Sequence, residues 1–97
     1  MQVNGYRVEL SEVEGALRSH AAVDDVVAFL RDGELVAVHT GAATDARTVL
    51  DAVAWRLPAY MVPSRLHYEP ALPLNDNGKV DRTRVVAELG SRQLSAH

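Results

Sequence analysis

Residues 23–40 read V-D-D-V-V-A-F-L-R-D-G-E-L-V-A-V-H-T, two β-rich runs on either side of Asp32-Gly33. An Asp-Gly pair between two such runs is the strongest short-range signal for a β-hairpin, because both residues tolerate the positive φ of a two-residue turn. The stretch therefore predicts two antiparallel strands, 23–31 and 34–40, joined by a tight turn.

The residues before this hairpin predict one short strand and one short helix. Residues 3–10 alternate apolar and polar side chains, as a half-buried strand does. Ser11 and Glu14 then match the S-x-x-E capping box at the start of a helix. Apolar residues continue at helical spacing, which predicts an amphipathic helix over 12–20. The helix N-terminus accounts for Glu12 and Glu14, so we assign neither a catalytic role.

A second helix is expected after the hairpin. Thr44 or Asp45 caps it, its apolar residues lie on one face, and Pro58 stops it. Trp55 falls on this helix, and we expect it to pack against neighbouring residues.

The last third of the chain predicts a strand at 65–69, a turn at 75–78 and a final helix at 82–89. Asp81 is the expected N-cap of that helix. The apolar residues expected to be buried on the helix are Val85, Val86 and Leu89. The order of elements predicts an α+β domain over residues 1–90, in which about three helices flank a small, mostly antiparallel sheet. Residues 91–97 are expected to form a polar tail or linker.

Composition narrows the class of protein. The chain has 97 residues, enough for one core, with a net charge of −3 and no basic run, so we expect no nucleic-acid partner. It has no cysteine, and its four histidines show no spacing that would converge on one metal, so no metal site is expected. No apolar stretch approaches the roughly 20 residues of a membrane span. Without a signal-peptide pattern, a cytoplasmic protein with no membrane partner is the expectation.

Lys79 is the first candidate for chemistry, and it is the only lysine beside nine arginines. It follows Asn77-Gly78, which should form a tight, mobile loop that projects the next side chain outward. A single ammonium on such a loop could enter a partner's pocket and neutralise a developing anion. The alternative is a solvated surface lysine beside a type I′ turn, and spacing alone favours this alternative.

Gly5 and Arg7 are the second candidates. A glycine within a strand pattern indicates a bulge or the close approach of another chain or ligand. Arg7, on the face opposite its apolar neighbours, could meet phosphate. The alternative is a glycine kink beside an exposed arginine, which the pattern alone favours.

Three segments resemble signature motifs of adenylate-forming enzymes. They are residues 5–14 (G-Y-R-V-E-L-S-E-V-E), 57–63 (L-P-A-Y-M-V-P) and 72–82 (L-P-L-N-D-N-G-K-V-D-R). All three follow the family's order and are spaced as in the family. The N-G-K-V-D-R ending is similar to that of the adenylation domains of nonribosomal peptide synthetases. The chain resembles the C-terminal subdomain of these enzymes, a small α+β lid.

The resemblance implies a role for each candidate residue. Family enzymes join a carboxylic acid to ATP with Mg²⁺, giving an acyl-adenylate; the lid then rotates and the phosphopantetheine thiol of a carrier protein attacks. Lys79 matches the catalytic lysine of the first step, supported by the turn residues Asn77 and Gly78. Gly5 matches a glycine that lines the pantetheine channel in the second step. Arg7 matches an arginine near phosphate in that second arrangement.

The resemblance also implies two partners, a large N-terminal core domain and a peptidyl carrier protein. The core domain would hold ATP and the acid, so the isolated chain is expected to be inactive and the identity of the acid stays open. One departure from the family lies near the candidate lysine: Asn75 replaces the usual threonine. The alternative function is a non-catalytic, stand-alone or vestigial lid that docks on a carrier protein or core domain. The intact Gly78-Lys79 pair favours the catalytic lid.

Overall fold

The computed structural model describes residues 2–3 and 6–89, and the side chains of residues 8–88. The elements in chain order are β1 (Gln2–Val3), β2 (Tyr6–Arg7), α1 (Leu10–Arg18), β3 (Val23–Arg31), β4 (Glu34–Gly41), α2 (Ala46–Val53), the 3₁₀ turn η1 (Ala59–Met61), β5 (Arg65–Tyr68) and α3 (Arg82–Leu89). This order confirms the predicted α+β class.

The main sheet has the strand order β3-β4-β5. β3 and β4 form the predicted antiparallel hairpin, in which Asp32 and Gly33 both have positive φ, 52° and 80°. β5 confirms the strand expected near 65–69 but lies parallel to β4. β1 and β2 form a separate antiparallel pair.

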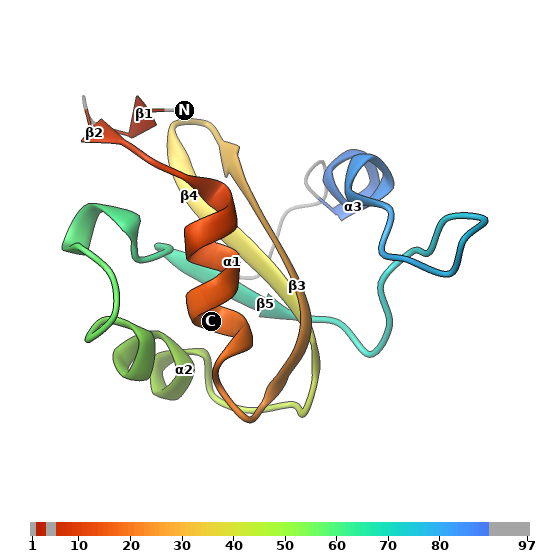
Figure 1. The fold of residues 1–97 in the computed structure, drawn as a ribbon, viewed down its shortest axis with the longest axis horizontal. Helices are drawn as coiled ribbons and strands as arrows, with labels where there is room; N and C mark the ends of the chain where they lie inside the picture. The colour runs from red at the N-terminus through yellow and green to blue at the C-terminus, as the bar shows by residue number, and fades with distance from the viewer. Residues whose placement is uncertain (1, 4–5, 90–97) are drawn as a thin grey trace.

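The helices cover both faces of this sheet (Figure 1). Side chains alternate along β4, so Leu35 and Ala37 join a core with residues of α1 and α2, while Val36 and Val38 face the other side. On that second side they pack with Leu72, from the segment before the lysine turn, and with Val85 of α3. α3 and this segment thus pack against a second core, on the face of the sheet opposite to α1 and α2. Within the described part of the chain, no helix has the length and apolarity needed to cross a bilayer.

The start of α1 differs from the sequence prediction. The helix begins at Leu10, its N-cap is Glu9, and no side chain caps it, so the predicted capping box of Ser11 and Glu14 is wrong. The preceding strand is also shorter than predicted, because β2 ends at Arg7. Val8 is already buried, so the chain turns into the helix as soon as this side chain reaches the core. Glu14 points into the domain instead of toward the helix end.

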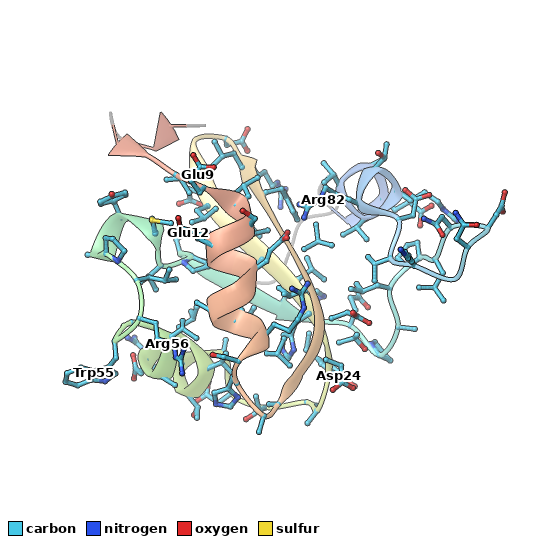
Figure 2. The ribbon with its side chains drawn as sticks, viewed as in Figure 1. Glu9, Glu12, Asp24, Trp55, Arg56 and Arg82 are labelled. Atoms are coloured by element: carbon cyan, nitrogen blue, oxygen red, sulfur yellow. The ribbon has the colours of Figure 1, made fainter. Side chains whose placement is uncertain are left out.

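The second helix confirms one prediction and corrects another. Asp45 is its N-cap, and the Asp45 carboxylate accepts a hydrogen bond of 3.1 Å from the Arg47 amide. The predicted packing of Trp55 is wrong, because 92% of this residue is exposed. Since α2 ends at Val53, Trp55 no longer follows the helical periodicity, and Figure 2 shows its ring pointing away from the domain.

The third helix has its predicted cap, since the Asp81 carboxylate accepts a hydrogen bond of 3.1 Å from the Arg84 amide. Val85 is fully buried, as expected. Val86 is 37% exposed, so its predicted burial is wrong, because Val85 and not Val86 faces the second core. The side chain of Leu89 lies outside the described residues.

Candidate functional site

Lys79 lies on a closed turn between β5 and α3. Leu74 and Val80 form an antiparallel bridge at its base. Within the turn, the Asn75 amide donates to the Lys79 carbonyl at 2.7 Å, and the Gly78 amide donates to the Asn75 carbonyl at 3.0 Å. The turn predicted at 75–78 is therefore present, and backbone hydrogen bonds hold the residue that carries the ammonium.

The side chain of Asn75 organises this turn. Its Oδ1 accepts hydrogen bonds from the Asn77 amide at 2.8 Å and from the Lys79 amide at 3.1 Å. An Asn carbonyl that bonds amides further along the chain mimics a backbone turn. From the sequence, Asn75 is only a departure from the family pattern. The sequence does carry a signal for this role: Asn75 opens a predicted turn, and an Asn side chain there can bond the amide two residues further on.

The two residues named as supports of Lys79 contribute through their backbones. Gly78 has a φ of 77°, which a residue with a Cβ rarely adopts, and Asn77 supplies its amide to Asn75. Asn77 itself does not have positive φ. The type I′ turn considered from the sequence is therefore wrong, since that turn needs two consecutive residues with positive φ.

Replacement of Asn75 by alanine is expected to loosen the turn without unfolding the domain. The amides of Asn77 and Lys79 lose their acceptor, at about 1 kcal/mol per hydrogen bond, so their hydrogen exchange should quicken roughly five- to tenfold. NMR of the labelled chain measures this directly. Asp76→Ala is the matched control, because this exposed side chain in the same turn makes none of these bonds. Unchanged exchange in Asn75→Ala would show that the backbone bonds alone fix the turn.

The Lys79 ammonium is available to a partner molecule. Its side chain is exposed, and it forms no ion pair with any residue from 8 to 88. Asp81, two residues after Lys79 in the sequence, is engaged in capping α3. A compact ammonium with three donors suits a cluster of anionic oxygens. In the same part of the chain, no group of three acidic or histidine side chains could hold a metal ion.

Of the second pair of candidates, the structure describes only one. Gly5 is outside the described residues, and of Arg7 only the backbone is described, paired with Gln2. Figure 1 shows β1 and β2 at one end of the long axis and the Lys79 turn at the other. The structure therefore brings Asn75, Asn77, Gly78 and Lys79 together and separates them from β2. One small reacting group cannot touch both ends in a single arrangement.

His39 is a buried titratable group whose pKa is lowered by the fold. It is 1% exposed, its ring meets Tyr68 edge-on at 5.5 Å, and its Nδ1 has no hydrogen-bond partner in the described structure. Burial lowers the pKa of His39, and the nearby His20 and His67 lower it further. A neutral imidazole in this place is a packing residue of the core.

The sequence was compared with protein families and with known proteins. No protein-family model matches the chain. A linear gramicidin synthase of Brevibacillus parabrevis is 42% identical over 95 residues, which are 90% of this chain and 2% of that protein. Phenyloxazoline synthase MbtB of a Mycobacterium species is 39% identical over 98 residues, 92% of this chain and 8% of that protein. The chain thus spans a small fraction of the length of these relatives.

Solved structures with the same fold include two adenylate-forming enzymes. NpsA of Klebsiella oxytoca, solved in complex with 3-hydroxyanthranilyl-AMSN, superposes with a TM-score of 0.85 at 28% identity, covering 94% of this chain and 19% of NpsA. The fold and motifs are those of the C-terminal subdomain of adenylate-forming enzymes. Within that class, the chain is most like the adenylation domains of nonribosomal peptide synthetases. The four-domain synthetase AB3403, bound to AMP and glycine, gives a TM-score of 0.71 at 33% identity, covering 84% of this chain and 7% of AB3403.

Proposed function

We propose that this chain is the mobile lid of an amino-acid adenylation domain and that Lys79 is its catalytic residue. Residues 1–90 would form the lid and residues 91–97 a tail or linker, in a cytoplasmic enzyme. The observation that carries the proposal is the Lys79 ammonium itself: exposed, held on an ordered turn, and free of ion pairs with the described residues. The partners are a large core domain and a peptidyl carrier protein.

In the first half-reaction, Lys79 would enter the core domain's site. There a carboxylate oxygen of the amino acid forms a bond to the α-phosphorus of ATP, and the bond to pyrophosphate breaks. ATP and Mg²⁺ are held mainly by the core domain, and this chain adds one point charge. At 4 Å and an effective dielectric near 20, that charge contributes about 4 kcal/mol against a developing anion. The ammonium would thus position the carboxylate oxygen of the amino acid beside an oxygen of the α-phosphate and neutralise the charge that develops there.

In the second half-reaction, the other end of the lid would face the site. Arg7, in β2, lies at that end, and Gly5 directly precedes β2 in the sequence. The pantetheine arm of the carrier protein would approach the adenylate there. The separation of the Lys79 turn from β1 and β2 supports this division of labour (Figure 1). Rotation of one rigid lid can present the two ends in turn to the same core domain.

The test separates the half-reactions by adding bulk at Gly5. In a full-length enzyme containing this lid, Gly5→Leu is expected to keep amino-acid-dependent ATP–pyrophosphate exchange within about twofold, while loading of the carrier protein falls by roughly tenfold or more because the channel narrows. Gly5→Ala, with a far smaller side chain, is the control and should lose much less. Equal loss of both half-reactions in Gly5→Leu would point instead to a folding role for the glycine.

A further inference from the structure

A charged pair, buried on its glutamate side, links the lid body to the helix that follows Lys79. The side chain of Glu14, in α1, is only 7% exposed. Its Oε1 accepts a hydrogen bond of 2.5 Å from Nη2 of Arg82, and its Oε2 accepts one of 2.7 Å from the Ala28 amide. Nη1 of Arg82 donates to the Ala28 carbonyl at 3.2 Å, which closes the ring. Figure 2 shows Arg82 reaching from the start of α3 toward β3.

This ring lies at one edge of the main sheet. β3 is an edge strand, so a backbone amide and a carbonyl on its outer side need partners other than a strand. Glu14 and Arg82 supply both partners at Ala28. A buried carboxylate is costly unless it is paired and hydrogen-bonded, and here both of its oxygens are engaged. The planar guanidinium fixes the direction of the contact as well as its distance.

The ring is connected to Lys79 by a short, hydrogen-bonded segment. Arg82 is the first residue of α3 and lies three positions after Lys79. Between them, the Asp81 amide donates to the Pro73 carbonyl at 2.8 Å, and the bridge from Leu74 to Val80 closes the base of the turn. A displacement of Arg82 would therefore carry the whole turn with it. A shift of about 1 Å in a catalytic group can cost roughly a hundredfold in rate.

We propose that Glu14 and Arg82 are a positioning pair for Lys79. They fix the start of α3 against α1 and β3, and so set where the ammonium lies when the lid closes for adenylation. This inference rests on the proposed function of Lys79. Neither residue touches substrate, and both act through the turn.

The experiment uses the two half-reactions of a full-length enzyme containing this lid. Glu14→Gln keeps the shape of the side chain but removes its charge. It is expected to slow single-turnover adenylate formation about tenfold and to leave thioester formation from a preformed adenylate within about twofold. Arg82→Met should give the same split, and Arg82→Lys should recover part of the lost rate. Thermal melts of each variant report whether the domain still folds.

Arg84→Met is the matched control. Arg84 lies on the same helix and also pairs with a glutamate, Glu88 at 2.9 Å, but this pair is exposed and stays within α3. It should leave both half-reactions unchanged. If Glu14→Gln does not fold, the comparison of Arg82→Lys with Arg82→Met takes its place, since the Arg82 side chain is half-exposed.

The double variant Glu14→Gln/Lys79→Ala separates this inference from the proposed function. If Glu14 acts through Lys79, the double variant should be no slower than Lys79→Ala alone. Multiplied losses, equal loss of both half-reactions, or parental adenylation in Glu14→Gln and Arg82→Met would overturn the positioning role. A parental adenylation rate in Lys79→Ala would instead overturn the proposed function, and the positioning role with it.

Discussion

Replacement of Lys79 by alanine in a full-length enzyme is expected to slow adenylate formation by about 10²–10³-fold, equivalent to roughly 3–4 kcal/mol of barrier. The loss follows from the removal of one preorganised charge at the site where anionic oxygens meet. Thioester formation from a preformed adenylate should survive, because in the proposed second arrangement of the lid the turn would face away from the reacting atoms. Single-turnover kinetics of each half-reaction on purified variant and parent provide the measurement.

Two controls accompany this prediction. Lys79→Arg should not restore the full rate, because a planar guanidinium cannot occupy the position of a compact ammonium. Folding should be unaffected in both variants, because the Lys79 side chain is exposed and the bonds that hold its turn come from backbone atoms and Asn75. A Lys79→Ala enzyme that forms adenylate at the parental rate would reduce the residue to a surface lysine.

Local chemistry explains which parts of the fold the sequence could predict. The Asp32-Gly33 hairpin and the caps at Asp45 and Asp81 each depend on residues only a few positions apart, and all three are present. The turn at 75–78 is of the same kind. Such features can be read from one sequence because the interacting groups are neighbours along the chain.

Long-range pairing explains what the sequence could not predict. The sequence interpretation of Glu14 depends on its neighbour Ser11, but its partner Arg82 lies 68 residues further along the chain. The same glutamate could form a local capping box or a distant ion pair, and in the structure it forms the ion pair with Arg82. The prediction for Trp55 fails for a different reason: α2 ends at Val53, before Trp55, so this residue lies on no helical face.

Asn75 shows how a difference from a family pattern can carry structural information. The Asn carbonyl reaches two amides of the Lys79 turn, one of them the amide of Lys79. Together with Glu14 and Arg82, it holds the segment from both sides of the lysine. The candidate site is thus one exposed ammonium on a turn that the Asn75 side chain holds in place.

Gly41, at the end of β4, gives the largest expected effect on stability. Its φ is 133°, and a Cβ at this position would collide with the Ala22 carbonyl oxygen and come within 2.9 Å of the Asp24 amide nitrogen. Both neighbours are backbone atoms, and a hydrogen bond of 2.9 Å from the Ala42 amide holds the Ala22 carbonyl in place. Gly41→Ala should therefore lower the free energy of unfolding by about 2–4 kcal/mol, as a strained backbone and a forced shift require. Urea denaturation of the isolated chain measures the change.

Gly15→Ala is the matched control and should act in the opposite direction. Gly15 lies inside α1, and a Cβ there would meet nothing within 4 Å. A glycine loses more backbone freedom than an alanine when the chain folds into a helix. Gly15→Ala reduces this loss, so the free energy of unfolding should rise by about 0.5–1 kcal/mol. The opposite signs separate a steric requirement from a general preference for alanine. If Gly41→Ala is as stable as the parent, the chain can relax around Ala22, and the end of β4 does not need a glycine beside the start of β3.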